Sequence, residues 1–223
     1  KKIGQLLHKL SPSVSKRVKV NRSSLRCLKD SHRKEDRLTV DTFTDASEKA
    51  YAAVVYARYE FEDGSIGTRL IAAKSRLAPL KALSIPRLEL MGAIIGFINQ
   101  TIVQSSLIEQ TKVTYWVDSC NVGYWIHSQS RNLKPFVAHR VGEIHKDSNP
   151  EQWRYVPGKL NPADHGTRGL TVESWSKKNV GGAGRRFLTN QKETSLSEGS
   201  QELPQQSFEE VQAAVREQEE RPQ

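Results

Sequence analysis

The sequence predicts an α/β fold with one mixed β-sheet of five strands flanked by helices. Three runs rich in β-branched and aromatic residues follow one another closely at 38–44, 51–59 and 68–73, as hairpin-linked strands do. Two further strands, at 113–117 and 153–156, are separated by segments of helical periodicity. Three hairpin-linked strands followed by strands that alternate with helices indicate a meander on one side of the sheet and parallel strands on the other.

The first three strands are joined by short connections. Glu62-Asp63-Gly64-Ser65 lies between the second and third runs and contains residues that tolerate the dihedral angles of a tight turn. We therefore expect an antiparallel meander at the start of the fold.

A long helix follows, with Ser84 as its N-cap and Pro86 in the first turn, where a missing N–H does no harm. One stripe at helical spacing is apolar and is predicted to be buried: Leu88, Met91, Ile95, Ile98 and Ile102. A second stripe is small and polar: Glu89, Ala93, Gly96 and Gln100. Small residues there let the helix approach a sheet closely and hold the Glu89 carboxylate near the helix start.

The second half of the fold alternates helices and strands. Helices are predicted at 121–127 and 133–145, and the last strand, 153–156, is stopped by Pro157-Gly158. After Asn161-Pro162-Ala163-Asp164, a final short helix is predicted to reach about Trp175.

Composition divides the chain into a basic arm or linker at 1–36, a folded domain at 37–178 and a flexible acidic tail at 179–223, with a short helix near 207–219. The whole chain has a formal net charge of +9. Residues 1–40 contain twelve Lys and Arg against three Asp and Glu, whereas residues 191–223 contain three against eight. The arm fits either contact with nucleic-acid phosphates or a solvated linker, and both interpretations stay open.

Several classes of protein are excluded by composition. No run approaches the roughly 18 to 20 apolar residues that cross a bilayer, and no signal segment opens the chain, so we expect an intracellular protein, cytoplasmic or nuclear, without a membrane partner. Cys27 and Cys120 match no metal-ligand spacing and suggest no disulfide framework. The chain begins at Lys1, which suggests a fragment of a longer protein.

Four carboxylates stand where an acidic side chain is structurally awkward: Asp45, Glu89, Asp118 and Asp164. Two of them end strands, one lies in the first turns of an apolar helix, and one follows Pro162. Because the carboxyl ends of parallel strands share one edge of a sheet, we expect these side chains to converge. Converging carboxylates need cations, and oxygen-only ligation favours Mg²⁺ or Mn²⁺. Two such ions about 3.5 to 4 Å apart can activate water against a phosphodiester.

Each carboxylate also has an ordinary structural explanation. Asp45 and Asp118 suit strand-end turns, Glu89 is a favourable charge at a helix N-terminus, and Asp164 suits an N-cap. The ordered set of four, rather than any single residue, favours a shared site.

Four short motifs in this order resemble the Asp, Glu, Asp, Asp signature of ribonuclease H: FTDAS (43–47), RLEL (87–90), WVDS (116–119) and NPAD (161–164). More narrowly, AAKSR (72–76), APLK (78–81), IPRLEL (85–90) and NPAD resemble the ribonuclease H region of BEL/Pao-type LTR retrotransposon polyproteins. The resemblance covers about residues 38–176.

This resemblance implies a ribonuclease H-like five-stranded mixed sheet and two-metal hydrolysis of the RNA strand of RNA–DNA hybrids, with Asp45, Glu89, Asp118 and Asp164 as metal ligands. It implies two Mg²⁺ ions, which Mn²⁺ can replace, and reverse transcriptase and integrase regions of the same polyprotein as partners. The expected contacts to the hybrid are Ser47, Lys74, Arg76, Arg87 and Lys159.

Two features depart from many retroviral-type relatives. The loop at 156–161 has no histidine before the final aspartate, which leaves proton shuttling without an obvious residue. The short span from Ser128 to Asn132 leaves no room for a basic handle helix.

Two other functions stay open on the sequence. A decayed or domesticated copy would keep the fold and bind nucleic acid without cutting it. Alternatively, the module would serve as a structural connector between polymerase and integrase.

Overall fold

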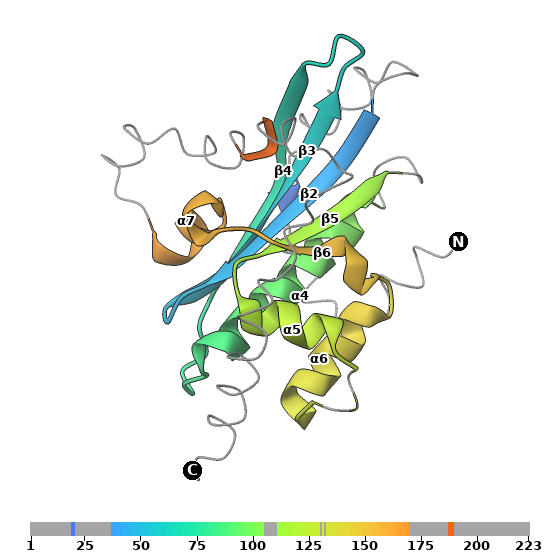
Figure 1. Ribbon diagram of the computed structural model, residues 1–223. Helices are drawn as coiled ribbons and strands as arrows, with labels where there is room; N and C mark the ends of the chain where they lie inside the picture. The colour runs from blue at the N-terminus through green and yellow to red at the C-terminus, as the bar shows by residue number, and fades with distance from the viewer. Residues whose placement is uncertain are drawn as a thin grey trace.

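The computed structural model describes residues 19–20, 37–104, 111–129, 131, 133–169 and 187–189. In chain order the main elements are β1 (Lys19–Val20), β2 (Arg37–Ala46), β3 (Ala50–Glu60), β4 (Ile66–Leu77), α4 (Ile85–Gln104), β5 (Lys112–Val117), α5 (Cys120–His127), α6 (Pro135–His145), β6 (Trp153–Tyr155) and α7 (Asp164–Arg168) (Figure 1). Two 3₁₀ turns, η2 (Pro150–Gln152) and η3 (Gly158–Leu160), flank β6.

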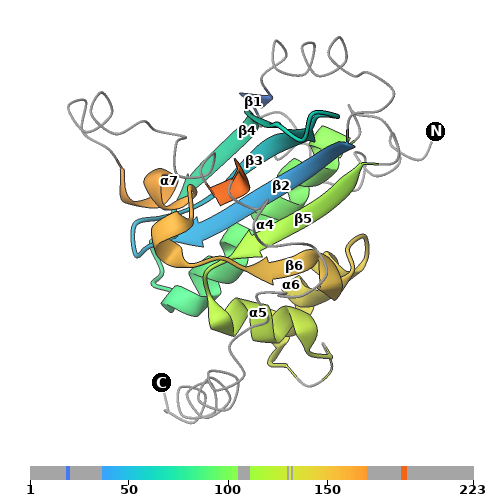
Figure 2. The same ribbon diagram turned by 45° about the horizontal axis from the view of Figure 1, so that its top comes forward.

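The strands form one mixed sheet in the order β1-β4-β3-β2-β5-β6, which Figure 2 shows from its upper edge downward. β2, β3 and β4 are the antiparallel meander, and β5 and β6 continue the sheet in parallel with β2. The predicted five-stranded mixed sheet with flanking helices is therefore confirmed. The two-residue strand β1 pairs with Ala72 and Ala73 of β4 and adds a short sixth strand that was not predicted.

The meander strands are longer than their most apolar runs. β3 and β4 contain 11 and 12 residues and pair from Ala50 with Leu77 to Glu60 with Ile66. The tight turn between them lies where the sequence predicts it. Gly64 has a φ of 73°, which glycine adopts without strain, and the Asp63 carboxylate accepts a hydrogen bond from the Ser65 N–H.

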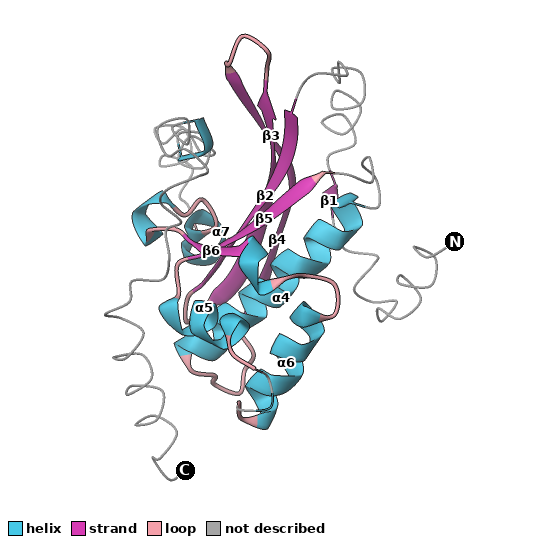
Figure 3. Ribbon diagram, turned by 45° about the vertical axis from the view of Figure 1, so that its right-hand side comes forward, coloured by secondary structure: helices cyan, strands magenta, loops and turns pink. Residues whose placement is uncertain are grey.

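Helices cover the two faces of the sheet unequally. α4 packs along β2 and β3, and α6 packs on α4. Figure 3 shows α4 and α6 on one side of the sheet and α7 on the other. None of the helices in the described part of the chain is long and apolar enough to cross a membrane.

The stripe of α4 that touches the sheet is the small, polar one. A Cβ on Gly96 would lie 2.5 Å from Thr44 Cγ2, and Gln100 accepts a hydrogen bond of 2.8 Å from the Thr42 hydroxyl. The predicted burial of the apolar stripe is correct only for Leu88 and Ile95. Its other members with described side chains, Met91 and Ile98, are half-buried. Two threonine side chains on β2 leave room only for small residues, so the apolar stripe lies on the flank of the helix.

Two segments outside 37–178 contact the sheet. β1 pairs with β4, and Phe187 packs edge-on against Phe43 and Trp116 while Leu188 is fully buried. α7 ends at Arg168, so the predicted extension of this helix to about Trp175 lies outside the described residues, as does the helix predicted near 207–219. The three-part division of the chain stays a prediction.

Candidate active site

Parallel pairing brings the two strand-end aspartates together. Thr44 of β2 lies opposite Val117 of β5, so the next residue of each strand, Asp45 and Asp118, stands at the same edge of the sheet. Asp45 is only 6% exposed. This register agrees with the expectation that neighbouring parallel strands place these two side chains close together at their carboxyl ends.

The close approach of α4 to β2 delivers Glu89 to the same edge. A Cβ on Gly92 would lie 2.9 Å from the backbone oxygen of Asp45, closer than a side chain tolerates. Glu89 stands one turn before Gly92 and is half-buried. The glycine therefore sets the distance between the Glu89-bearing turn and the end of β2.

Asn161 fixes the start of α7 and so the position of Asp164. Its amide donates a hydrogen bond of 2.9 Å to the backbone oxygen of Thr44, and its Oδ1 accepts one of 3.1 Å from the Ala163 N–H. Two serine hydroxyls hold the other end of the helix: Ser47 donates to the Thr167 carbonyl at 2.9 Å and Ser75 to the Gly166 carbonyl at 3.0 Å. The last aspartate is thus anchored to the strand that bears the first.

Burial and mutual repulsion make ionisation of the carboxylates unfavourable. Burial, followed by the charges of Asp118 and Asp164, raises the pKa of Asp45 to about 7, against the lowering effect of its hydrogen bond from Thr167. Burial raises the pKa of Glu89 to about 7, with Asp118 and Asp45 adding to the shift. Burial also raises the pKa of Asp118, and the charge of Asp164 adds to it. Asp45 and Asp118 therefore each interact electrostatically with the other three carboxylates.

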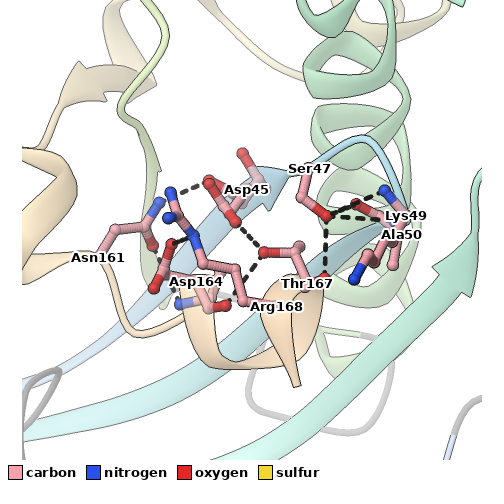
Figure 4. Close-up of polar contacts among 10 residues, drawn as sticks. Asp45, Ser47, Lys49, Ala50, Asn161, Asp164, Thr167 and Arg168 are labelled. Carbon is pink, nitrogen blue, oxygen red and sulfur yellow. Dashed lines mark hydrogen bonds and ion pairs between the residues drawn. The ribbon is translucent and has the colours of Figure 1, made fainter. Parts of the chain in front are cut away.

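Each carboxylate has its own donor within the protein (Figure 4). The Thr167 hydroxyl donates to Asp45, and Arg168 Nε lies 2.5 Å from Asp164 Oδ1. In the same way, the Ser119 hydroxyl donates to Glu89 and a hydrogen bond from Asn161 lowers the pKa of Asp118. These donors offset part of the cost of four neighbouring acidic groups.

The carboxylate oxygen atoms of this site are of the chemical type that binds a hard divalent cation. Among the described residues, no group of three or more His, Cys, Asp or Glu side chains has an arrangement that could hold a metal ion. The carboxylate oxygens point instead to the hydroxyl and guanidinium donors. A cation at this edge would relieve the repulsion that raises the pKa values, provided that it replaced some of these donors.

The expected hybrid contacts lie at different distances from this edge. Ser47 holds the β2–β3 turn by accepting from the Lys49 and Ala50 N–H groups, and Lys159 lies in the exposed η3 turn next to Asp118. Lys74 and Arg76 lie on β4, two strands from β2, on the side of the sheet that faces α4. The Arg87 guanidinium lies 5.2 Å from the centre of the Phe136 ring.

Four polar residues of the site were not predicted as site residues: Ser119, Asn161, Thr167 and Arg168. Three of them had a local signal. Thr167 and Arg168 lie three and four residues after Asp164, the spacing at which helical side chains meet. Asn161 precedes a short helix by a spacing typical of Asx turns.

A comparison with protein families supports the resemblance seen in the sequence. The model of the "Pao retrotransposon-like RNaseH-like domain" matches residues 3–119. The matched range contains Asp45, Glu89 and Asp118 and ends before Asp164. No curated protein matches the chain.

Among solved structures, the chain is similar to the N-terminal RNase H domain of rv2228c from Mycobacterium tuberculosis, with 14% identity, a TM-score of 0.36, and 68% of this chain and 98% of that one covered. It is also similar to LC11-RNase H1, a protein isolated from compost by a metagenomic approach. The LC11-RNase H1 structure in complex with RNA/DNA hybrid matches with 13% identity, a TM-score of 0.38, and 63% of this chain and 98% of that one covered.

Proposed function

This chain belongs to the family of Pao retrotransposon-like RNaseH-like domains, and from that premise we propose that it hydrolyses the RNA strand of RNA–DNA hybrids. The observation that carries the proposal is the convergence of four carboxylates, from β2, α4, the end of β5 and α7, at one edge of the sheet. Three of them have raised pKa values because of burial and mutual repulsion. Such an arrangement is costly for stability and suits a cation-dependent reaction.

Asp45, Glu89, Asp118 and Asp164 would hold two Mg²⁺ ions, with Mn²⁺ as a substitute. When bound, such ions supply an activated water and stabilise the leaving oxygen of a phosphodiester. Cleavage would leave a 3′-hydroxyl and a 5′-phosphate.

The chain's own residues orient this carboxylate set. Thr167 and Asn161 hold Asp45 and Asp118 from the side of α7, and Ser119 holds Glu89. Arg168 offsets the charge of Asp164, and its side chain is 71% exposed, so it is free to move away when a cation binds. We expect the loss of the Arg168 charge to lower the Mg²⁺ concentration that gives half-maximal cleavage.

Substrate contacts extend the proposal beyond the carboxylates. Ser47 and Lys159 stand beside the site and would contact the scissile strand, whereas Lys74, Arg76 and Arg87 would contact phosphates farther away. A polyprotein with reverse transcriptase and integrase regions, and a cytoplasmic or nuclear location, belong to the same proposal.

Cleavage of a hybrid with a 5′-labelled RNA strand tests the function. The full chain should cut the RNA in Mg²⁺ and not in EDTA, and should leave duplex RNA and duplex DNA intact. Asp118→Asn should abolish cutting. Glu151→Gln, which removes an exposed carboxylate in η2 before β6, should leave it unchanged. Cutting by Asp118→Asn at the wild-type rate would contradict the proposal.

One observation favours a second candidate, a module that binds hybrids without cutting them. The four carboxylates are already held by Ser119, Asn161, Thr167 and Arg168, and among the described residues no group of three or more His, Cys, Asp or Glu side chains is arranged to hold a metal ion. Binding of the labelled hybrid in Ca²⁺, together with intact RNA after long incubation in both Mg²⁺ and Mn²⁺, would support this candidate over hydrolysis.

A further inference from the structure

A groove lies between α4 and the strands β3 and β4. Its helix wall is apolar and includes Met91, Ile94 and Ile98, each of which is half-buried. Lys74 and Arg76 of β4 line the opposite wall. We call this feature the α4 groove. It contains three members of the apolar stripe that the sequence predicts to be buried: Met91, Ile95 and Ile98.

The floor of the α4 groove contains a buried polar group without a partner. Asn99 lines the groove and is fully buried, and within the described residues neither its Nδ2 nor its Oδ1 has a hydrogen-bond partner. An unpaired buried amide is costly, because its lost hydration is not replaced. An apolar wall, two cations and an unpaired amide together indicate a surface that binds a segment with apolar, acidic and polar groups.

We propose that the α4 groove binds residues 207–219 of the same chain as an amphipathic helix. Phe208, Val211 and Val215 share one face of that predicted helix, and Glu209 and Glu210 flank it. Residues 191–223 contain eight Asp and Glu against three Lys and Arg, so their charge is opposite to that of Lys74 and Arg76. Apolar pattern and charge both match the two walls of the groove.

The N-terminal segment matches the charge of the groove less well. Residues 1–18 precede β1, which pairs with Ala72 and Ala73 of β4. They contain five Lys and Arg and no acidic residue, and Lys74 and Arg76 would repel them. The acidic segment is therefore the occupant that electrostatics favours.

The acidic segment is within reach of the groove. Phe187 and Leu188 pack on the sheet, and the described chain ends at Thr189. Seventeen residues separate Thr189 from Ser207 and span up to about 60 Å when extended. That length is sufficient to pass around the edge of a small domain.

Docking of this segment has a consequence that rests on the proposed function. Because Lys74 and Arg76 would also contact hybrid phosphates, the docked acidic helix would compete with nucleic acid. The tail would then act as an autoinhibitory element that high substrate concentration displaces.

Photo-crosslinking of the full chain tests the docking without metal or nucleic acid. A benzophenone amino acid at position 208 should crosslink to the tryptic peptide that begins at Leu88 and contains the groove wall of α4. The same group at Ala213, on the opposite side of the predicted helix, is the matched control and should crosslink far less. Mixing ¹⁵N-labelled with unlabelled protein distinguishes crosslinks within one chain from those between two.

Charge reversal supplies a second arm. Glu209→Lys with Glu210→Lys should lower the crosslink yield from position 208 roughly tenfold, because two attractive contacts become repulsive. Lys74→Glu with Arg76→Glu should have the same effect, and combining all four changes should restore the yield. The tail variant changes no residue of the described sheet and helices, so its effect is attributed to the tail itself.

Several results would overturn the docking: crosslinks elsewhere than the groove, crosslinks only between two copies, equal yields from positions 208 and 213, or no restoration by the combined variant. Adding RNA–DNA hybrid separates this inference from the proposed function. Hybrid should lower the yield if Lys74 and Arg76 contact nucleic acid. An unchanged yield would contradict that contact while the docking of the tail would stand.

Discussion

Gly92→Ala should disturb the site through the backbone, without touching any carboxylate. A Cβ at this position would lie 2.9 Å from the backbone oxygen of Asp45 and 3.6 Å from that of Ala52. A backbone oxygen in the sheet cannot rotate away as a side chain can. Relief therefore requires α4 to move away from β2 by a few tenths of an ångström.

The expected magnitude combines two opposing effects. Overpacking of this kind costs roughly 1 to 3 kcal/mol, and replacing a helical glycine by alanine returns up to about 1 kcal/mol. We expect a net loss of about 1 to 2 kcal/mol, which for a domain of this size lowers Tm by about 3 to 8 °C. Because Glu89 moves with the helix and Asp45 does not, cleavage should fall by about tenfold.

Gly142→Ala in α6 is the matched control. A Cβ at Gly142 would meet no atom within 4 Å, so the change should raise Tm slightly and leave cleavage unaltered. Thermal melting and single-turnover cleavage of the same preparations give both quantities. Wild-type Tm and cleavage for Gly92→Ala would refute the argument that this glycine sets the distance between Glu89 and Asp45.

Three further substitutions test the electrostatics of the site and of the sheet. Asp118→Asn should leave Tm in EDTA at pH 8 unchanged or higher, because it removes one of several repelling charges, and a large fall in Tm would favour a turn-residue role for Asp118. Burial raises the pKa of Asp41 to about 6, so this carboxyl alone should contribute a loss on the order of 2 kcal/mol to the pH dependence of stability between pH 4 and pH 8, as it ionises in the folded state. Asp41→Asn should remove that loss in urea unfolding, and an identical pH profile would contradict the burial argument. Thr167→Val should lower the free energy of unfolding by roughly 1 kcal/mol and raise the Mg²⁺ requirement of cleavage, because Asp45 loses its hydroxyl donor, whereas Thr167→Ser should behave as the wild type.

The sheet and its functional edge could be predicted because local patterns agree with the topology. β2 and β5 show the β-branched and aromatic character of buried strands; Asp45 is the last residue but one of β2, and Asp118 directly follows β5. Parallel pairing then dictates that Asp45 and Asp118 meet. The order of elements sufficed for this part of the site, with no knowledge of side-chain contacts.

The close approach of the small stripe of α4 to the sheet could be predicted, but the partial exposure of its apolar stripe could not be predicted from the residues of the helix alone. The helix is apolar on several sides, so the stripe with the largest side chains looked like the buried one. The sheet decides otherwise, because Thr42 and Thr44 stand where the helix must approach and leave room only for Gly96 and its neighbours. Similarly, a two-residue strand such as β1 has too few residues to show a period.

The donors of the site were missed for a related reason. A hydroxyl or amide becomes a partner of a carboxylate only when distant elements meet, as Thr167 does with Asp45 across 122 positions of the chain. The pair of Asp164 and Arg168, at helical spacing, was visible locally, whereas the local signals at Thr167 and Asn161 did not reveal which distant carboxylate each would contact.

The central claim is that four carboxylates form one divalent-cation site. Calorimetric titration of the full chain with Mg²⁺ at pH 8 measures this most directly, with Asp118→Asn as the test variant and Glu151→Gln as the control for nonspecific carboxylate binding. The account predicts saturable binding by the wild type and Glu151→Gln, and binding at least tenfold weaker for Asp118→Asn, as expected for the loss of a charged ligand. Equal Mg²⁺ affinity in all three proteins would contradict it.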